Sequence, residues 1–200
     1  TAFAFVRIGE CYQRLGNASA AILYYKKAVH EDPLLAKGWL YLTNIYFEQK
    51  SYEKAAYYIS KVLSIDESDT LYWRRYSEIK LKLNFFEEAI KGFEMCLSLG
   101  DEDVNVFIAL VDVLTFVGEF SAALKTLIKA QKTHKNFAEI EYRFAGLFLA
   151  LNKQKIGIEH LVKAINIDYD YHIILKELYP SVYFNEGIQK LLKDFKKATE

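Results

Sequence analysis

The sequence predicts an all-α fold, an α-solenoid of stacked helical hairpins, on three observations. The 200 residues include two prolines and nine glycines, so long uninterrupted elements are expected. Hydrophobic residues make up 52% and aromatic residues 16%, which is too apolar for a disordered chain. Small and bulky residues recur every 34 positions, which is typical of repeats that stack in one dimension.

The 34-residue period appears in several independent series. One series of small residues contains Ala21, Ala55, Ala89, Ala123 and Gly157. A second series lies seven positions after the first and contains Ala28, Val62, Cys96, Ala130 and Ala164. A third series lies twelve positions before the first and contains Gly9, Thr43, Ser77, Val111 and Ala145. A bulky series contains Phe5, Trp39, Trp73 and Phe107, with Glu141 as the exception. We expect the small residues where two helix backbones approach closely, and the aromatic residues between neighbouring hairpins.

Each period has the pattern of two helices joined by a short turn. Trp39, Leu42 and Tyr46 fall on one face of a first helix, and Ala55, Ile59 and Val62 on one face of a second. A polar stretch, residues 49–52, separates them, and the matching turns of the other periods contain Gly or Asn, which suit the left-handed end of a helix. Such a hairpin buries its apolar face only by stacking on the next one.

These residues resemble the tetratricopeptide repeat. In the first period the resemblance rests on Phe5, Ile8, Gly9, Tyr12, Ala21, Tyr25, Ala28 and Pro33. It covers residues 1–171 as five repeats, at 2–35, 36–69, 70–103, 104–137 and 138–171. It departs from the family at Val111, which is large for its position, and at Glu141. The resemblance implies a right-handed superhelix that acts as a protein–protein interaction scaffold. RNA-binding pentatricopeptide repeats have a longer period and are usually basic, and this chain has neither property.

Residues 172–200 are expected to form a degenerate sixth unit and a capping helix. Pro180 should end a helix near Tyr179. A last helix is expected from about Asn185 to Lys197, with the apolar stripe Ile188, Leu191, Leu192 and Phe195. Its lysine-rich face is interpreted as the solvated side of a cap rather than as a membrane or nucleic-acid patch.

The start of the chain has a different character. Phe3, Phe5, Val6 and Ile8 begin at once, with no capping helix before them, so we interpret the chain as a fragment. We expect a homodimer through this uncapped N-terminal repeat. A cytoplasmic location is expected, although any targeting segment would lie upstream of a fragment.

Charge and motifs favour binding over catalysis. Lys and Arg together number 26, as do Asp and Glu, and the zero net charge argues against nucleic acid as a partner. The histidines are dispersed and the glycines do not cluster, so we predict no enzyme activity, no cofactor and no metal site. No apolar run is long enough for membrane insertion. Cys11 and Cys96 fall on apolar helical faces and are expected to be buried thiols.

The resemblance also implies a binding groove along the first helices of successive repeats. The matching positions that we select as candidate peptide-binding residues are Tyr41, Asn44, Phe47, Arg74, Arg75, Glu78, Asp112, Tyr142 and Arg143. Arg74 with Glu78 could instead form a local pair four residues apart. The residue set that clamps chaperone tails is incomplete, because Leu40 stands where a lysine is needed. We expect an extended or helical segment of a protein in this groove; an assembly module using its end or outer faces, or a regulatory arm of a larger enzyme, are the alternatives.

Overall fold

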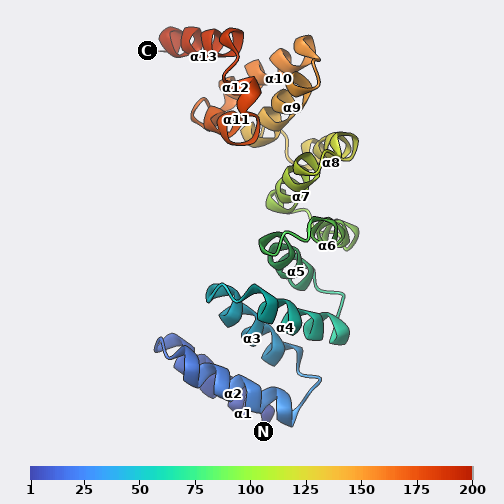
Figure 1. The fold of residues 1–200 in the computed structure, drawn as a ribbon, viewed down its shortest axis with the longest axis vertical. Helices are drawn as coiled ribbons and strands as arrows, with labels where there is room; N and C mark the ends of the chain where they lie inside the picture. Colours follow the sequence, from blue (N-terminus) through green and yellow to red (C-terminus); the bar gives the residue numbers. More distant parts are fainter. Residues whose placement is uncertain (200) are drawn as a thin grey trace. The chain divides into compact units, whose positions relative to one another are not determined.

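The computed structural model describes residues 1–199, and the side chains of residues 1–198. Residue 200, the last of the expected segment 172–200, lies outside the described residues. Residues 1–199 form thirteen α-helices and one 3₁₀ helix without a β-strand (Figure 1). The predicted all-α fold of helical hairpins is confirmed.

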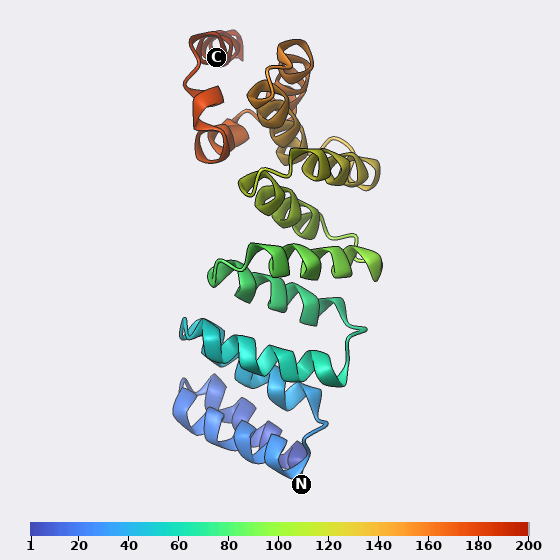
Figure 2. The same cartoon turned by 45° about the vertical axis from the view of Figure 1, so that its right-hand side comes forward.

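Backbone contacts divide the chain into two compact units, residues 1–101 (unit 1) and residues 102–200 (unit 2). In unit 1 three antiparallel hairpins follow one another, as Figure 2 shows. Their helices are α1 (Ala2–Arg14), α2 (Ala18–Glu31), α3 (Ala36–Glu48), α4 (Tyr52–Ile65), α5 (Thr70–Lys82) and α6 (Phe86–Ser98).

Unit 2 contains two further hairpins and a C-terminal segment of shorter elements. The hairpins are α7 (Val104–Phe116) with α8 (Phe120–Thr133), and α9 (Ala138–Ala150) with α10 (Gln154–Ile167). The C-terminal segment contains η1 (Asp170–His172), α11 (Ile173–Leu178), α12 (Pro180–Tyr183) and α13 (Glu186–Thr199).

Pro180 divides the C-terminal segment as its chemistry requires. α11 ends at Leu178, and Pro180 opens α12 at a first-turn position, where the missing N–H is not needed. α13 runs slightly beyond the expected end at Lys197, and Ile188 and Leu192 of its apolar stripe are buried. The first helices of the five hairpins begin 34 residues apart, from Ala2 to Ala138. The assignment of repeat boundaries within 1–171, and of 172–200 as a separate end unit, stays a prediction.

The turns inside the hairpins repeat one backbone device. The second residue after each first helix has a positive φ, between 58° and 85°, in the series Gly16, Lys50, Asn84, Gly118 and Asn152. The next residue donates its backbone N–H back into the last turn, as in Ser51 to the Tyr46 carbonyl at 2.8 Å. This is the Schellman ending of a helix, which favours Gly and Asn. Lys50 adopts the same conformation with a side chain that does not favour it.

The small-residue series lie in the core. Ala21, Ala55, Ala89 and Ala123 are fully buried. A Cβ built on Gly157 would lie 2.6 Å from Cγ of Leu149, so the α9–α10 hairpin can close only because position 157 has no side chain.

The cysteine expectation is half wrong. Cys96 is buried, and burial raises the pKa of its thiol to about 12. Cys11 is exposed, because it lies on the part of α1 that the rest of unit 1 leaves uncovered. None of the helices within residues 1–199 has the length and apolar character needed to cross a bilayer.

Candidate functional site

The nine candidate groove residues fall on the first helices of both units. We call these positions the inner face of each unit. The inner face of unit 1 contains Tyr41, Asn44 and Phe47 from α3 and Arg74, Arg75 and Glu78 from α5; that of unit 2 contains Asp112 from α7 and Tyr142 and Arg143 from α9.

A polar pocket lies at one end of the inner face of unit 1. It has a volume of about 390 Å³ and is lined by Glu10, Gln13, Arg14 and Tyr41. Tyr41 donates a hydrogen bond to Oε1 of Glu10, and its ring stacks on that of Tyr25 with centroids 4.7 Å apart. The Tyr41 hydrogen bond holds the pKa of Glu10 below its usual range, and burial raises the pKa of Tyr41. The pocket therefore offers both donors and acceptors around one fixed aromatic ring.

A second cluster, further along the same face, combines a ring, a cation and a carboxylate. The guanidinium carbon of Arg75 lies 4.6 Å from the ring centroid of Phe47, and Nη1 of Arg75 donates to Glu78 at 2.7 Å. The side chains of Arg75 and Glu78 are 31% and 48% exposed. An exposed pair of this kind contributes little stability. Arg75 can therefore exchange Glu78 for the carboxylate of a ligand at low cost.

Arg74 forms an ion pair within unit 1. Its Nε donates to Oδ2 of Asp101 at 2.5 Å, and its Nη2 donates to Oδ1 of the same carboxylate. The Asp101 side chain is only 3% exposed, so the pair is part of the packing between α5 and the end of α6. Glu78 forms a local pair with Arg75, three residues before it.

Asn44 lies on α3 between Tyr41 and Phe47. Its Oδ1 is buried and accepts no hydrogen bond within the described residues. A buried acceptor without a donor costs free energy. The Asn44 side chain is thus placed between the polar pocket and the Phe47–Arg75 cluster with its amide oxygen buried.

In unit 2 two of the three candidates, Tyr142 and Arg143, are buried, so their side chains offer little surface to a ligand. Tyr142 is fully buried and donates to the Asp168 carbonyl at 2.9 Å. Arg143 is 4% exposed and grips Asp112 through two hydrogen bonds, Nε to Oδ1 at 2.7 Å and Nη2 to Oδ2 at 2.8 Å. Arg143 and Asp112 therefore satisfy each other's hydrogen-bonding groups within the protein, and the Asp112 carboxylate is already paired.

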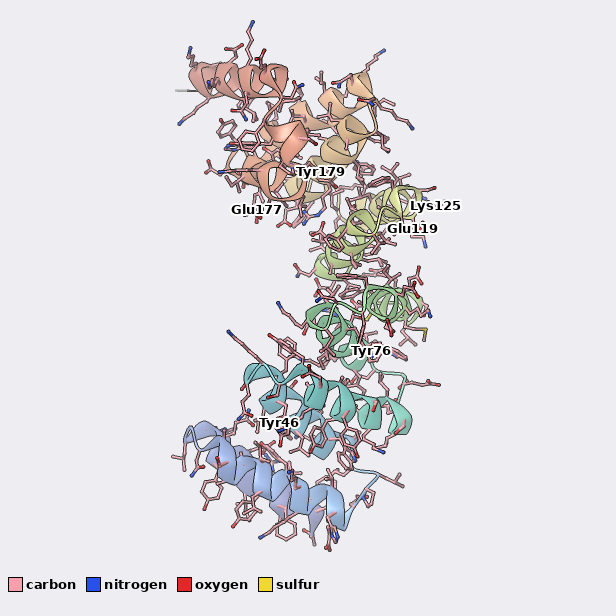
Figure 3. All side chains as sticks on the ribbon, in the orientation of Figure 1. Tyr46, Tyr76, Glu119, Lys125, Glu177 and Tyr179 are labelled. Carbon is pink, nitrogen blue, oxygen red and sulfur yellow. The ribbon has the colours of Figure 1, made fainter. Side chains whose placement is uncertain are left out.

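The C-terminal segment causes the burial of the unit 2 candidates. At earlier junctions the first helix of a hairpin packs on the second helix before it: α3 on α2, α5 on α4 and α9 on α8. α11 and α12 instead pack on α9, a first helix. Tyr179, labelled in Figure 3, lies so close to Gly146 that a Cβ there would be 2.2 Å from its ring. The inner face of α9 is thus covered by residues of the same chain.

Tyr179 lies deep in this contact. It is 5% exposed, and burial raises the pKa of its hydroxyl to about 12. The Thr115 hydroxyl lies near enough to oppose that shift, but the two hydroxyls do not form a hydrogen bond of ordinary geometry. Tyr179 is therefore held by its ring on Gly146 rather than by its hydroxyl.

One buried polar cluster in unit 2 was missed by the sequence reasoning. Glu141 accepts from Gln131 at 2.6 Å and lies 2.6 Å from Nδ1 of His160. The His160 ring stacks on Phe144 and Phe148, with centroids 4.6 and 5.5 Å away. The available signal was Glu141 itself, a charged residue at a position that is aromatic in the four earlier repeats. Within the residues that the structure describes, no three potential metal-ligating side chains gather at one point.

Comparisons with known proteins agree with this architecture. A family model described as a tetratricopeptide repeat matches residues 4–33, which span most of the α1–α2 hairpin. Among solved structures, YrrB, described as a TPR protein with an unusual peptide-binding site, superimposes with a TM-score of 0.77. The two share 18% sequence identity, and the match covers 88% of this chain and 91% of YrrB.

Two structures of MamA are also similar. One has a TM-score of 0.75 at 17% identity, covering 89% of this chain and 94% of MamA. The other, MamA 41-end from Desulfovibrio magneticus RS-1, has a TM-score of 0.72 at 15% identity, covering 84% of this chain and 96% of that structure. At these identities the likeness concerns the fold. The family match at residues 4–33 and the hairpins that follow in the same register show that the chain has the fold of tetratricopeptide-repeat proteins.

Proposed function

We propose that the protein is an interaction scaffold that binds an extended segment of a partner on the inner face of unit 1. The observation that carries this proposal is the difference in solvent exposure between the candidate residues of unit 1 and those of unit 2. Tyr41, Phe47, Arg75 and Glu78 are partly or fully accessible, whereas Tyr142 and Arg143 of unit 2 are covered.

The chemistry of the face suggests what the segment carries. The Phe47 ring and the Arg75 guanidinium offer one apolar contact beside a cation. Arg75 can pair with a carboxylate in a bidentate manner once Glu78 is displaced. The polar pocket at Tyr41 suits a hydrogen-bonding side chain or the peptide backbone. An extended segment with one acidic residue next to an apolar residue fits this set. The description of YrrB as peptide-binding is compatible with such a use of the fold.

The test begins with a random peptide library displayed on phage and selected against the purified chain. Selected peptides are then titrated by calorimetry into the wild type, Arg75→Glu and Phe47→Ala. We expect each substitution to weaken binding about tenfold or more, as for central contacts of an interface. Lys91→Glu reverses one exposed charge on α6 and is the matched control, which should leave affinity unchanged. Equal affinity of Arg75→Glu and the wild type would contradict the proposal.

Assembly through an end face is the second candidate, and one observation favours it. On α1 and its following turn, Phe3 is 68% exposed and Leu15 is 79% exposed, and Ile8 on the same helix is 38% exposed. Apolar side chains gathered on one helix favour association, either with a second copy or with another protein. Light scattering over a range of concentrations tests the homodimer. Concentration-dependent dimerisation that Phe3→Glu abolishes would support it, and a constant monomeric mass would exclude it.

A further inference from the structure

A second pocket in unit 1 lies away from the inner face. It lies between α2 and α4, has a volume of about 480 Å³, and is walled by Trp39, Tyr57 and Tyr58, with Lys26 and His30 among its other lining residues. At about 100° per residue, Trp39 is roughly 140–160° around α3 from Tyr41 and Asn44. Nothing in the proposed inner-face function uses this pocket.

The aromatic walls are held in place before any ligand arrives. Nε1 of Trp39 donates to the Pro33 carbonyl at 2.9 Å. Tyr58 stacks between Trp39 and Tyr46, with ring centroids 6.0 and 5.2 Å away. Tyr57 meets the edge of Tyr58 at 5.2 Å and remains 56% exposed. Rings that are already ordered lose little conformational entropy on binding.

The next junction in unit 1 shows that the fold does not require these walls. There Nε1 of Trp73 donates to the Glu67 carbonyl at 2.8 Å, the same bond one repeat later. The positions 34 residues after Tyr57 and Tyr58 are Lys91 and Gly92. The indole anchor is thus repeated, while the paired tyrosines are particular to the α2–α4 junction.

The basic and acidic side chains that line the pocket are of one sign. Among the described residues that line it, Lys26 and His30 are the ones that can carry a charge, and both are basic. Nζ of Lys61 lies 5.4 Å from the ring centroid of Tyr57, which is one of the lining residues. A ligand that places carboxylates beside these groups and an apolar ring on Tyr57 would satisfy both features.

We propose that this pocket binds an acidic, proline-containing segment of a partner protein. A proline ring stacks on an aromatic face, and proline-rich segments are already extended, so binding orders them at little cost. The Trp39 indole N–H is occupied by Pro33 and cannot serve the ligand. The segment is therefore held by ring contacts with Trp39 and Tyr57 and by its carboxylates on Lys26 and Lys61, and its affinity falls as salt rises.

Fluorescence anisotropy with three labelled peptides tests the proposal. The first alternates Glu with Pro over nine residues, the second replaces each Pro by Ala, and the third replaces each Glu by Lys. We expect the wild-type chain to bind the first peptide, to bind the second about tenfold more weakly, and to show no detectable binding of the third. Failure to bind the first peptide, or equal binding of the first and third, would overturn the proposal.

Substitutions locate the site and separate it from the inner face. Tyr57→Ala and Lys26→Glu should each weaken binding of the first peptide about tenfold, and both side chains are exposed, so neither change should disturb the core. Phe85→Ala removes an equally accessible ring elsewhere in unit 1 and should have no effect, as should Arg75→Glu on the inner face. Unchanged affinity of Tyr57→Ala would overturn the assignment. So would tighter binding to phosphatidylserine vesicles or to a single-stranded oligonucleotide than to the acidic peptide.

Discussion

The inner faces of units 1 and 2 are formed by the same repeat positions, but the first is exposed to solvent and the second is covered by the chain itself. In unit 1, Arg75 forms an exposed pair with Glu78. In unit 2, Arg143 is buried and forms a bidentate ion pair with Asp112, beneath a C-terminal segment that packs on α9. Repeat position therefore determines on which side of a helix a residue lies. What the chain places over that side determines whether a ligand can reach it.

Removing the carboxylate partner of each arginine gives the largest expected difference between the faces. Asp112→Ala leaves a buried guanidinium whose remaining contacts are with Glu139, its carboxylate at 3.4 Å and its backbone carbonyl at 3.2 Å, and should cost about 3 kcal/mol of unfolding free energy. Glu78→Ala frees an arginine that water already reaches and should change stability by less than about 0.5 kcal/mol. Urea unfolding gives the totals, and hydrogen exchange assigns each loss to a unit.

Hydrogen exchange matters here because stacked hairpins need not unfold in one step. After Asp112→Ala we expect faster exchange in α7 and α9 with α1 to α6 unchanged. Equal costs for the two substitutions would show that the Arg143 pair is no more buried in solution than the Arg75 pair.

The contact of Tyr179 with Gly146 gives the second test of the difference between the two inner faces. Gly146→Ala puts a methyl group into the space of the ring and should cost about 1–3 kcal/mol. Because the clash is with α11 and α12, exchange should rise in residues 173–183 before it rises in α9. Asn44→Ala, at the equivalent position in the second repeat, is the control, since no such segment covers it. Unchanged exchange in 173–183 would mean that the segment is not seated on Gly146.

Much of this architecture could be predicted because it follows from local spacing. The 34-residue series already indicates the hairpins, and the buried alanines at 21, 55, 89 and 123 lie where that series places them. Glycine and asparagine likewise mark most of the turns that have a positive φ. These features depend on a few neighbouring residues and on the helix period, and both can be read directly from a sequence.

The covered face could not be predicted in the same way. The burial of Tyr142 and Arg143 depends on a segment about thirty residues later that packs on α9 instead of α10. Pro180 indicates that the helix breaks, but not the direction that the chain takes afterwards. The partner of Arg74 was also missed, because Asp101 lies 27 residues away and meets it only after α5 and α6 fold together.

A titration compares one carboxylate of each unit, Glu141 of unit 2 and Glu10 of unit 1, whose pKa values are both lowered. Burial would raise the pKa of Glu141, but hydrogen bonds from His160 and Gln131 hold that pKa below its ordinary value of 4.5. A carboxylate with a lowered pKa in the folded state stabilises the protein above that ordinary value and loses this contribution as the pH falls through the lowered pKa. We therefore expect unit 2 to lose stability below pH 4.5, seen as faster exchange in α9 and α10.

Glu141→Gln keeps a hydrogen-bonding side chain of the same shape but cannot titrate, so it should flatten this acid dependence in unit 2. Glu10→Gln should do so in unit 1 alone, because Tyr41 lowers the pKa of Glu10 there. If Glu141→Gln left the acid response of α9 and α10 unchanged, other carboxylates would have to account for it.

The smallest expected effect concerns a turn, because the α3–α4 turn of unit 1 carries backbone strain that the α7–α8 turn of unit 2 avoids. Lys50 has a φ of 58°, whereas the equivalent turn of α7–α8 has Gly118 at 85°. Lys50→Gly should therefore stabilise the protein by about 0.5–1 kcal/mol, because the left-handed conformation costs a side-chain-bearing residue roughly that much more than glycine, even after the greater chain entropy of glycine is counted. The measurement is the urea midpoint at constant slope, with Lys54→Gly in the α4 interior as the opposite control. That control should lose about 1 kcal/mol, because helix interiors disfavour glycine. A destabilising Lys50→Gly would mean that contacts of the lysine side chain outweigh the strain of its backbone.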